Sequence, residues 1–343
     1  MLNAIPSTKS SPYSSKLGGY FDYDNAKRCR EKKANVSKMT VSRVINHPEQ
    51  VRPELREMIL NVMTQLDYHP NAAARALVGR RTRVVKLTIF EDMDTTEPYY
   101  MMLLAGIANE LNQHQYALQI ATRNSYEVGE CDGYILTGIR QADYAWVERL
   151  NQPVVFVGSN RQGYDYVDTN NYQAVWESTR YAAEQGYTHL VFIGIAIAEP
   201  FELDRERGFR EYVTTHHISA QIIRLANHSH VATAYVKSHW SGFPRNTAFI
   251  CASDRLAIGV ETAIINQGGR VPIEYGIIGF DGVLLNQIAA KRLTTMKQPL
   301  EAMGRAAARL LLANINHTDR SRGRHDQEKI IINSRLSVAE STR

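Results

Sequence analysis

The sequence predicts a small all-α head followed by a larger α/β body, in which parallel sheets form two doubly wound lobes. Three observations lead to this prediction. Positive charge is concentrated in the first quarter of the chain, and a helix-turn-helix pattern lies in that same quarter. From Val84 onward, apolar strands alternate with helices. A chain of 343 residues also suits about two or three compact units rather than one.

The charge of the chain is divided unevenly. Residues 1–83 hold 15 Lys and Arg against 7 Asp and Glu, whereas residues 84–343 hold 25 against 28. A basic end on a nearly neutral body is typical of a small domain that binds a polyanion such as a nucleic acid. A basic terminal segment can also be merely solvated, so the charge gains its meaning from the helical pattern that accompanies it.

The segment before the head, residues 1–23, is rich in Ser, Gly, Tyr and Lys without periodicity, so we expect it to be disordered. It lacks the apolar stretch of a secretory signal, and no apolar run in the chain approaches the roughly 20 residues of a membrane span. The three cysteines lie far apart and indicate neither a disulfide framework nor a metal site. We therefore expect a cytoplasmic protein that uses no metal and no cofactor.

Two short helices are the clearest elements of the predicted head, residues 24–70. Ser37 is suited to cap the first helix. Its apolar side repeats at helical spacing through Val41, Val44 and Ile45. The second helix is expected over residues 53–66, with an apolar stripe of Leu55, Met58, Ile59, Val62 and Leu66. A short helix with one apolar side and a basic, hydrogen-bonding tip has the shape that enters a DNA major groove.

The head is followed by a short Ala-rich stretch that ends at Gly79. Such a helix is too short to be stable alone. Residues 71–83 are therefore predicted to be a hinge helix and linker between head and body.

The body is predicted from eight apolar runs separated by helical stretches. The expected strands are VVKLTIF from Val84, YALQIA from Tyr116, GYILTG from Gly133, PVVFVGS from Pro153, HLVFIGI from His189, AQIIRLA from Ala220, NTAFICAS from Asn246 and YGIIGFDG from Tyr275. The expected helices cover 99–113, 171–185, 205–217, 231–239, 254–267 and 299–315. Apolar strands with intervening helices indicate parallel sheets covered on both faces. Such sheets bind ligands beyond the carboxyl ends of their strands, here in the crevice between the lobes.

Several motifs occur in the order and at the spacing of a known family. They are VSKMTVSRVIN, LDYHPNAAARAL, DRERGF at 204–209, ASDRLAIG at 252–259, GIIGFDG at 276–282 and LTTMKQPLEAMGRAAARLL at 293–311. By these motifs the chain resembles the lactose-repressor (LacI/GalR) family of bacterial transcription regulators from about residue 32 to its C-terminus. The resemblance implies a helix-turn-helix head, a hinge helix and a periplasmic-binding-protein-like sensor over residues 84–343. Its two lobes are expected at 84–160 plus 298–316, and at 161–297 plus 317–340.

The resemblance also implies which residues contact DNA. Lys38 and Met39 would be the main base-reading positions, and Arg43 would read a guanine edge or contact a phosphate. Leu77 falls where the family pushes an apolar wedge into the minor groove. Simple packing is the alternative for Met39, and a contact with the sensor is the alternative for Leu77. The full set of implied DNA contacts is Ser37, Lys38, Met39, Thr40, Ser42, Arg43, Asn46, Asn71, Ala74 and Leu77.

In the sensor, Arg205 matches the family's effector-binding arginine, whose planar fork can clamp vicinal hydroxyls or a carboxylate. Asp281 ends a predicted strand and matches the family's acidic effector contact. Tyr99 and Tyr100 open the first sensor helix, where the family places aromatic rings against the ligand, although one of them could equally be buried core. The remaining implied contacts are Asn160, Ser253 and Asp254.

Alternatives stay open for these last three residues. Ser253 stands where the family often has Asn. Asp254 could be the N-cap of a helix rather than a ligand contact. Asn160 follows a strand at a crossover between the lobes and could serve the hinge alone.

The chain departs from the family pattern at three places. The residues that align with the first helix of the helix-turn-helix, Cys29 to Glu31, put charge at positions expected to be buried. The connection from Thr122 to Cys131 is shorter than the dozen residues that a parallel crossover normally needs, so one sheet face could be open or covered by a partner. No leucine heptad is seen at the C-terminus, so we expect a dimer rather than a tetramer.

Three classes of function compete at this point. The leading hypothesis is a ligand-responsive repressor, most consistent with a carbohydrate-utilisation operon, which binds a palindromic operator as a homodimer and a sugar-like effector between its lobes. The alternative is a sugar-binding sensor with impaired DNA binding. An enzyme is the weakest candidate, because the chain has no P-loop, HExxH or GxSxG motif and no catalytic residue is expected. The histidine pairs at 216–217 and at 228 and 230 are interpreted as exposed loop residues.

Overall fold

A computed structural model describes residues 36–37, 40–41, 43–44, 50–65, 81–91, 98–123, 125, 129–283, 289–316 and 327–343. The chain divides into two compact units, residues 1–80 and residues 81–343. The expectations for the N-terminal 23 residues and for the hinge helix lie outside the described residues. Among those described, no helix is both long and apolar enough to cross a membrane.

In the smaller unit, the predicted cap of the first helix is confirmed. The Ser37 hydroxyl accepts a hydrogen bond of 3.1 Å from the Thr40 backbone amide, and Val44 is buried. The second helix, α3 (Pro53–Gln65), buries Ile59, Val62 and Met63. Placing Met58 on that stripe was wrong: it is 40% exposed, because the buried face follows the i, i+3, i+4 spacing of the three other residues.

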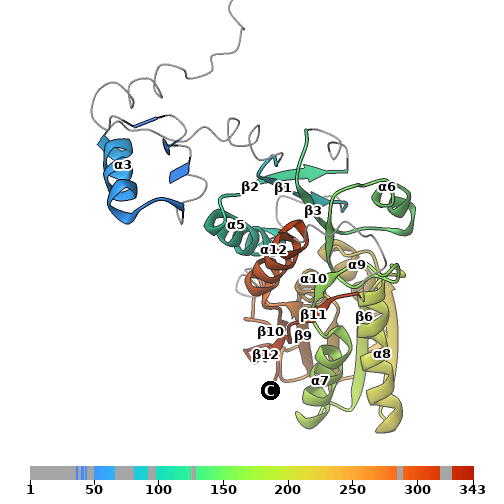
Figure 1. Cartoon of the computed structure of the whole chain (residues 1–343). Helices are drawn as coiled ribbons and strands as arrows, with labels where there is room; N and C mark the ends of the chain where they lie inside the picture. The colour runs from blue at the N-terminus through green and yellow to red at the C-terminus, as the bar shows by residue number, and fades with distance from the viewer. Residues whose placement is uncertain are drawn as a thin grey trace, which may run out of the picture. The chain divides into compact units, whose positions relative to one another are not determined.

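The larger unit is built on two sheets, each with six strands in the described residues (Figure 1). The first has the order β11-β5-β4-β3-β1-β2. Its strands are β1 (Val84–Ile89), β2 (Ala117–Thr122), β3 (Gly133–Thr137), β4 (Val154–Val157), β5 (Tyr166–Asp168) and β11 (Lys329–Ile331). All of its paired strands are parallel.

The second sheet has the order β12-β10-β9-β8-β6-β7. Its strands are β6 (His189–Ile195), β7 (Ser219–Leu225), β8 (Thr247–Cys251), β9 (Tyr275–Asp281), β10 (Thr294–Lys297) and β12 (Arg335–Ser337). Only β12 pairs in the antiparallel sense among these described strands. The eight predicted strands are all present. The four that the analysis missed, β5, β10, β11 and β12, have three or four residues each, too few for a periodic signal.

The helices agree with the predicted stretches, with one shift. The long helices of this unit are α5 (Pro98–Gln113), α7 (Asn171–Glu184), α8 (Pro200–Thr215), α9 (Ser229–Ser238), α10 (Asp254–Asn266) and α12 (Leu300–Asn316). Shorter turns form η2 (Gln141–Asp143), α6 (Tyr144–Val147) and η3 (Trp240–Gly242). Helix α8 begins five residues before the predicted start at 205, because Pro200 occupies its first position, which favours proline.

Strand pairing corrects the predicted lobe boundaries. Strand β5 pairs with β4, and β11 pairs with β5, so both belong to the first lobe. The expected division at residue 160 and the assignment of all of 317–340 to the second lobe were therefore wrong. The chain crosses between the lobes three times: from β5 to α7, from β10 to α12 and from β11 to β12.

All three crossings lie at one edge of the larger unit. Strands β5 and β11 form that edge of the first sheet, and β10 and β12 form it in the second. Two of the crossing segments are tied together by a 2.6 Å hydrogen bond between the hydroxyls of Thr169 and Ser334. The opposite edges of the sheets, at β2 and β7, have no such connection in the part of the chain that is described.

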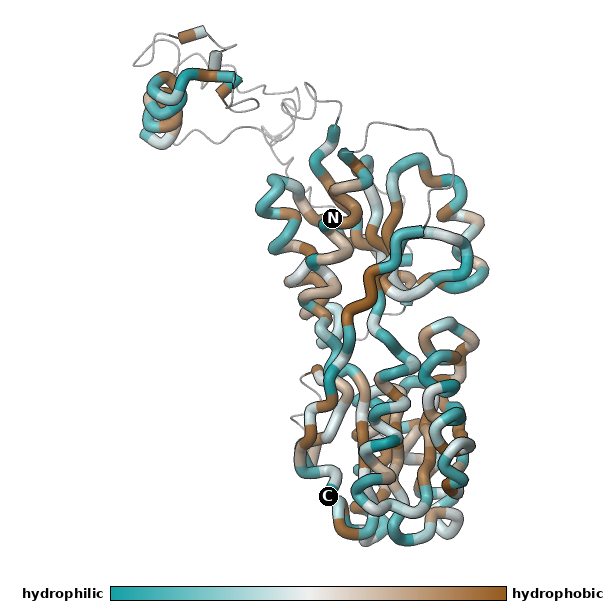
Figure 2. Tube along the Cα trace, turned by 60° about the horizontal axis from the view of Figure 1, so that its bottom comes forward, coloured by the Kyte–Doolittle hydropathy of each residue, from teal (hydrophilic) through white to brown (hydrophobic). Residues whose placement is uncertain are grey.

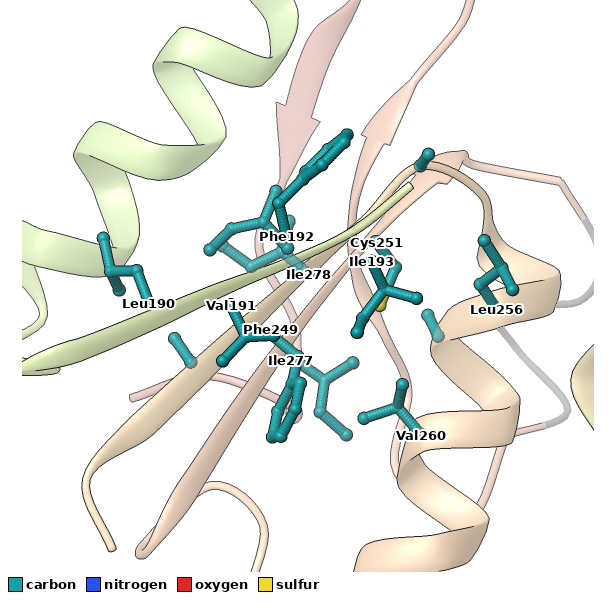
Figure 3. Close-up of a cluster of buried hydrophobic side chains, with 14 of the residues drawn as sticks. Leu190, Val191, Phe192, Ile193, Phe249, Cys251, Leu256, Val260, Ile277 and Ile278 are labelled. Carbon is teal, nitrogen blue, oxygen red and sulfur yellow. The ribbon is translucent and has the colours of Figure 1, made fainter. Parts of the chain in front are cut away.

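Each lobe has its own apolar core. In the first lobe, α5 and α12 lie side by side over the sheet and bury Leu87, Leu103 and Leu311 (Figure 1). In the second lobe, side chains of β6, β8 and β9 form one core with Leu256 and Val260 of α10, and Phe192 stacks on Phe209 of α8 at the other face of the sheet (Figure 3). In Figure 2 the hydrophobic colour is concentrated along these strands, as expected for sheets covered on both faces.

The short connection between β2 and β3 contains no helix among its described residues, as predicted. One of its described residues, Gly129, contacts the sheet. Lys86 of β1 is fully buried, and its Nζ donates a 2.7 Å hydrogen bond to the carbonyl of Gly129 in this connection. A backbone oxygen thus satisfies the buried ammonium group where the family would place a helix.

The contact between α5 and α12 depends on two glycines. A Cβ atom at Gly106 would lie 2.1 Å from the Glu301 carbonyl oxygen, and one at Gly304 would lie 2.4 Å from that of Leu103. These distances are far below van der Waals contact, so the two helix backbones can approach this closely only without side chains there.

We therefore expect Gly106→Ala to destabilise the larger unit by about 1–3 kcal/mol, because the helices must separate. Thermal unfolding followed by circular dichroism would show a melting temperature lower by several degrees. Gly242→Ala is the matched control, since a Cβ there meets no atom within 4 Å. Equal melting temperatures for the two variants would contradict the packing argument.

Candidate functional site

A cavity of about 610 Å³ lies between the two lobes of the larger unit, where the carboxyl ends of both sheets face each other. One wall comes from the first sheet, and every strand from β5 to β2 contributes to it. The residues at or just beyond these strand ends are Asp168, Ser159, Arg140, Glu91 and Arg123. This is the location predicted for a ligand of doubly wound sheets.

The opposite wall comes from the second sheet in the same way. Its five strands from β10 to β7 contribute Gln298, Asp281, Ser253, Ile197 and Asn227. Helix α8 adds Arg205 and Phe201. Both walls therefore run from the edge with the lobe crossings to the free edge at β2 and β7.

Arg205 is a cationic group of the cleft whose side chain is held in place by several contacts. Its Nε donates to the Asn171 side chain at 2.9 Å, and its Nη1 donates to the Ala252 carbonyl at 2.7 Å. Its guanidinium carbon lies 3.7 Å from the ring centre of Phe280. These contacts hold the guanidinium plane fixed, and Nη2 has no protein partner among the described residues. A planar, pre-oriented donor of this kind suits a ligand with adjacent oxygen atoms.

Two carboxylates from opposite lobes accompany Arg205. Asp168 accepts backbone hydrogen bonds from Ser159 at 2.9 Å and Thr169 at 2.7 Å, and burial raises its pKa despite them. Asp281 accepts a 2.7 Å bond from the side chain of Gln298, and its backbone has a φ of +115°. Few residues other than glycine adopt this conformation, so the chain is strained where Asp281 enters the cavity wall.

Tyr99 and Tyr100 both line the cavity, as the resemblance implied. Burial raises the pKa of Tyr99, and the nearby carboxylates of Asp281 and Asp168 raise it further. Its hydroxyl is therefore a neutral donor placed among acceptors. Tyr100 is fixed differently, because its hydroxyl donates to Glu91 at 2.7 Å.

Ser253 lines the cavity but has a second role. Its hydroxyl donates to the Asn227 side chain at 2.6 Å, and it accepts a hydrogen bond from the Leu256 amide at the start of α10. Ser253, rather than Asp254, is thus the N-cap of this helix.

Asp254 does not line the cavity, so the structure does not support the expected effector contact. It is fully buried and accepts hydrogen bonds from the Thr295 hydroxyl at 2.6 Å and from the Gly282 amide at 3.0 Å. Burial, together with the charge of Asp281, raises the pKa of Asp254 to about 8. It supports the loop that follows Asp281 from behind the wall.

Asn160 is also placed outside the cavity wall. Its side-chain oxygen accepts hydrogen bonds from the amides of Gln162 and Tyr164, and its nitrogen donates to the Tyr164 carbonyl. These bonds close the loop between β4 and β5. The short polar side chain is used by its own turn, as Asn often is, and not by a ligand.

The cavity wall contains charged groups that the sequence analysis missed. It carries four arginines, Arg123, Arg140, Arg205 and Arg255, and four carboxylates, Glu91, Asp168, Glu199 and Asp281. Arg140 contacts Glu91 in its own lobe at 2.7 Å and Glu199 of the other lobe at 3.8 Å. Glu91 and Arg123 each lie just after a predicted strand, which was the available signal. An isolated charged residue after a strand is too common to identify a ligand site by itself.

Glu202, on the first turn of α8, lies behind the cavity wall rather than in it. Its Oε1 accepts a 2.9 Å hydrogen bond from the Ile195 amide at the end of β6, and its side chain is buried. Burial raises the pKa of Glu202 to about 7, against an ordinary value of 4.5. The carboxyl group thus joins α8 to the strand that supplies the cavity wall.

The expected DNA-contacting residues are described only in part. Ser37 and Arg43 are exposed and Thr40 is half-buried, and all three belong to the first described helix or its cap. Lys38, Met39, Ser42, Asn46, Asn71, Ala74 and Leu77 lie outside the described residues. The structure therefore supports the helix and its cap, and it leaves the readout of bases as a prediction.

Over the described residues there is no group of three His, Cys, Asp or Glu side chains placed to hold a metal ion. The four histidines of the two pairs at 216–217 and at 228 and 230 are exposed, as predicted, but His230 lies in helix α9 and not in a loop. His228 also lines the cavity at the end of β7.

Two family profiles match the chain. "Bacterial regulatory proteins, lacI family" matches residues 32–71, and "Periplasmic binding protein-like domain" matches residues 179–338. The uncharacterized HTH-type transcriptional regulator YvdE of Bacillus subtilis (strain 168) is 45% identical over 312 residues, which cover 91% of this chain and 97% of the relative. The ribose operon repressor of the same organism is 28% identical, over 82% of this chain and 89% of that protein.

Solved structures share the fold. The lac repressor dimer bound to operator and an anti-inducer matches with a TM-score of 0.73 and 20% identity, over 93% of this chain and 98% of that one. A complex of the transcriptional regulator CelR with cellobiose matches with a TM-score of 0.68 and 24% identity, over 92% and 99%.

The raised pKa of Glu202 makes a testable statement about stability. The unfolded chain loses this proton near pH 4.5 and the folded chain near pH 7, so the group reduces the free energy of unfolding as pH rises between these values. The reduction amounts to about 3 kcal/mol when it is complete. Glu202→Gln should therefore melt at a higher temperature than wild type at pH 8, with little difference at pH 4.5.

Glu206, one turn later, is the control. Burial opposes its ionisation, but hydrogen bonds from Arg224 and Arg210 outweigh burial and lower its pKa. Glu206→Gln should therefore be destabilising at pH 8. If Glu202→Gln also lowers the melting temperature at pH 8, its carboxyl group is ionised without penalty and the argument fails.

Proposed function

The chain belongs to the lacI family of bacterial regulatory proteins, and on this premise we propose that it represses a carbohydrate-utilisation operon in response to a sugar-like effector. It is a ligand-responsive DNA-binding regulator and not an enzyme. The observation that carries the proposal is the cavity between the lobes, whose walls consist of strand ends from both sheets around Arg205. A ligand there contacts both lobes at once, so it favours one lobe arrangement over another.

The lining supports a polyhydroxylated effector. Hydroxyl groups can donate to the carboxylates of Asp168 and Asp281 and accept from the Arg205 guanidinium. Aromatic rings such as Tyr99 offer apolar faces beside these polar groups, which is the combination found in small-molecule sites. Solved relatives of the same fold are described with cellobiose and with ribose bound.

We propose that the head, residues 24–70, and the hinge, residues 71–83, bind a palindromic operator as part of a homodimer. A single short recognition helix reads few bases, and two-fold symmetry doubles the site. The solved lac repressor is a dimer on its operator, which supports this assembly. Since such a regulator acts on chromosomal DNA, we place the protein in the cytoplasm.

The second candidate, a sugar sensor that has lost DNA binding, is favoured by one feature. Charged residues from Arg30 to Glu31 stand where the family's first head helix is apolar, and they lie outside the described residues. Quantitative DNA binding decides between the two candidates, because the sensor alone would bind the effector without binding any specific duplex.

Arg43 provides the test of DNA reading. It is exposed on the described helix, so replacing it removes a DNA contact without opening the core of the head. We expect Arg43→Ala to weaken binding to the operator, identified by selection from random duplexes, by about 1–3 kcal/mol. Arg180→Ala, which removes an exposed arginine of α7, is the control and should bind DNA like wild type. Unchanged binding in Arg43→Ala would exclude this arginine from the interface.

Arg205 and Asp281 provide the test of effector binding. Arg205→Lys keeps the charge but loses the fork, and Asp281→Asn keeps the volume but loses the charge. We expect both variants to bind operator DNA. The sugar concentration that changes their DNA binding should be at least about tenfold higher than for the wild type, whether the sugar weakens or strengthens that binding. Arg207→Ala, an exposed neighbour on the same helix, is the matched control. A wild-type response in both cleft variants would place the effector elsewhere.

A further inference from the structure

From the dimensions and the charge of the cavity we infer that the effector is a neutral, elongated saccharide of at least two rings, and not a single sugar or a sugar phosphate. This inference rests on the proposed function, because it takes the cavity to be the site of a sugar-like effector. It goes further by naming the size and charge class of that ligand.

The length of the cavity comes from the strand order. Each wall contains the ends of five adjacent strands, from β5 to β2 in one sheet and from β10 to β7 in the other. Four strand spacings of about 4.8 Å give a wall of about 19 Å. One sugar ring spans only about one such spacing. The cavity volume of about 610 Å³ agrees, since it lies within the roughly 300–1,000 Å³ of sites that enclose ligands larger than one sugar ring.

The charge of the wall is balanced. It contains four arginines and four carboxylates, and several of them are already paired within the protein. Arg140 is paired with Glu91 and lies near Glu199, and Arg123 donates to Asp143 at 2.6 Å. A phosphate or carboxylate ligand would need an excess of cationic donors to replace its hydration, and this wall has none. Neutral hydroxyls, by contrast, can bond to both kinds of group.

The cavity wall carries two adjoining groups of polar side chains. Near the lobe crossings, Arg205, Asp168, Asp281 and Tyr99 form one polar cluster. The group of Glu91, Arg140 and Glu199 follows toward the free edge. Tyr144 opens α6, four residues after Arg140 in the connection that follows β3, and its ring lines the same cavity.

Tyr144 is built as a rigid aromatic surface. Its ring is stacked on that of Phe156, with centres 6.0 Å apart and planes 13° apart, and Tyr164 lies 6.5 Å away at 22°. Both Tyr144 and Phe156 line the cavity. A supported ring offers an apolar area of the kind that packs against the face of a sugar ring. We assign the first sugar ring to the polar cluster and the second to Tyr144.

Isothermal titration of the full chain with neutral mono-, di- and trisaccharides and with sugar phosphates tests the inference. The tightest ligand should be a neutral di- or trisaccharide, bound at least tenfold more tightly than its own constituent monosaccharide and than its phosphorylated form. A monosaccharide or a sugar phosphate as the tightest ligand would overturn the inference and leave the proposed function intact. If no saccharide binds, the proposed sugar effector itself is wrong.

The variant Tyr144→Leu tests the second subsite. It should weaken binding of the tightest di- or trisaccharide about tenfold, and it should reduce the gain in affinity from the first ring to the second. Tyr172→Leu, a tyrosine outside the cavity, is the matched control and should preserve that gain. If Tyr144→Leu leaves the gain unchanged, the assignment of the second ring is overturned. The dependence of wild-type affinity on the number of sugar rings decides the main inference, and it does not require either variant to fold.

Discussion

The opposition of two parallel sheets, carboxyl edge to carboxyl edge, is the constraint on which the rest of this protein depends. Parallel strands end together, so the loops that follow the parallel strands of either lobe reach the same space. The three crossings, all on the β5 and β10 side, then keep the carboxyl ends of the two sheets facing each other. Because the cavity is made by the relation between lobes, and not within either one, any ligand that fills it reports on that relation.

The charged groups of the cleft act in two layers. Arg205 and Asp281 face the cavity, and residues behind them set their positions. Asn171 accepts from Arg205 and donates to Asp168, so it joins groups of the two lobes at the first crossing. Asp254 binds the backbone after Asp281 from within the core and thereby supports its unusual conformation. A buried carboxyl group is costly to ionise, which is why it carries several donors here.

The sequence predicted most of the fold because apolar runs and helical stretches are signals summed over many residues. It failed where an element is short or where a residue's role depends on its partner. Strands of three residues, such as β5 and β11, have no period to detect, so the lobe boundaries were misplaced. Asp254 and Asn160 match ligand positions by motif, yet their side chains face the protein. Glu199 contacts Arg140 of the other lobe, and no local sequence pattern shows a contact between residues so far apart in the chain.

The bond between Thr169 and Ser334 ties two of the three crossings into one narrow strip along the β5 and β10 edge. A rigid lobe fixed along a strip moves by rotation about that strip, as in hinge closure. A given rotation displaces atoms beside the strip very little and displaces those at β2 and β7 most. An attractive force of a given size therefore exerts a larger torque when it acts far from the hinge. The distance that a ligand extends from the hinge toward β2 and β7 thus determines how strongly it rotates the lobes, separately from its binding affinity.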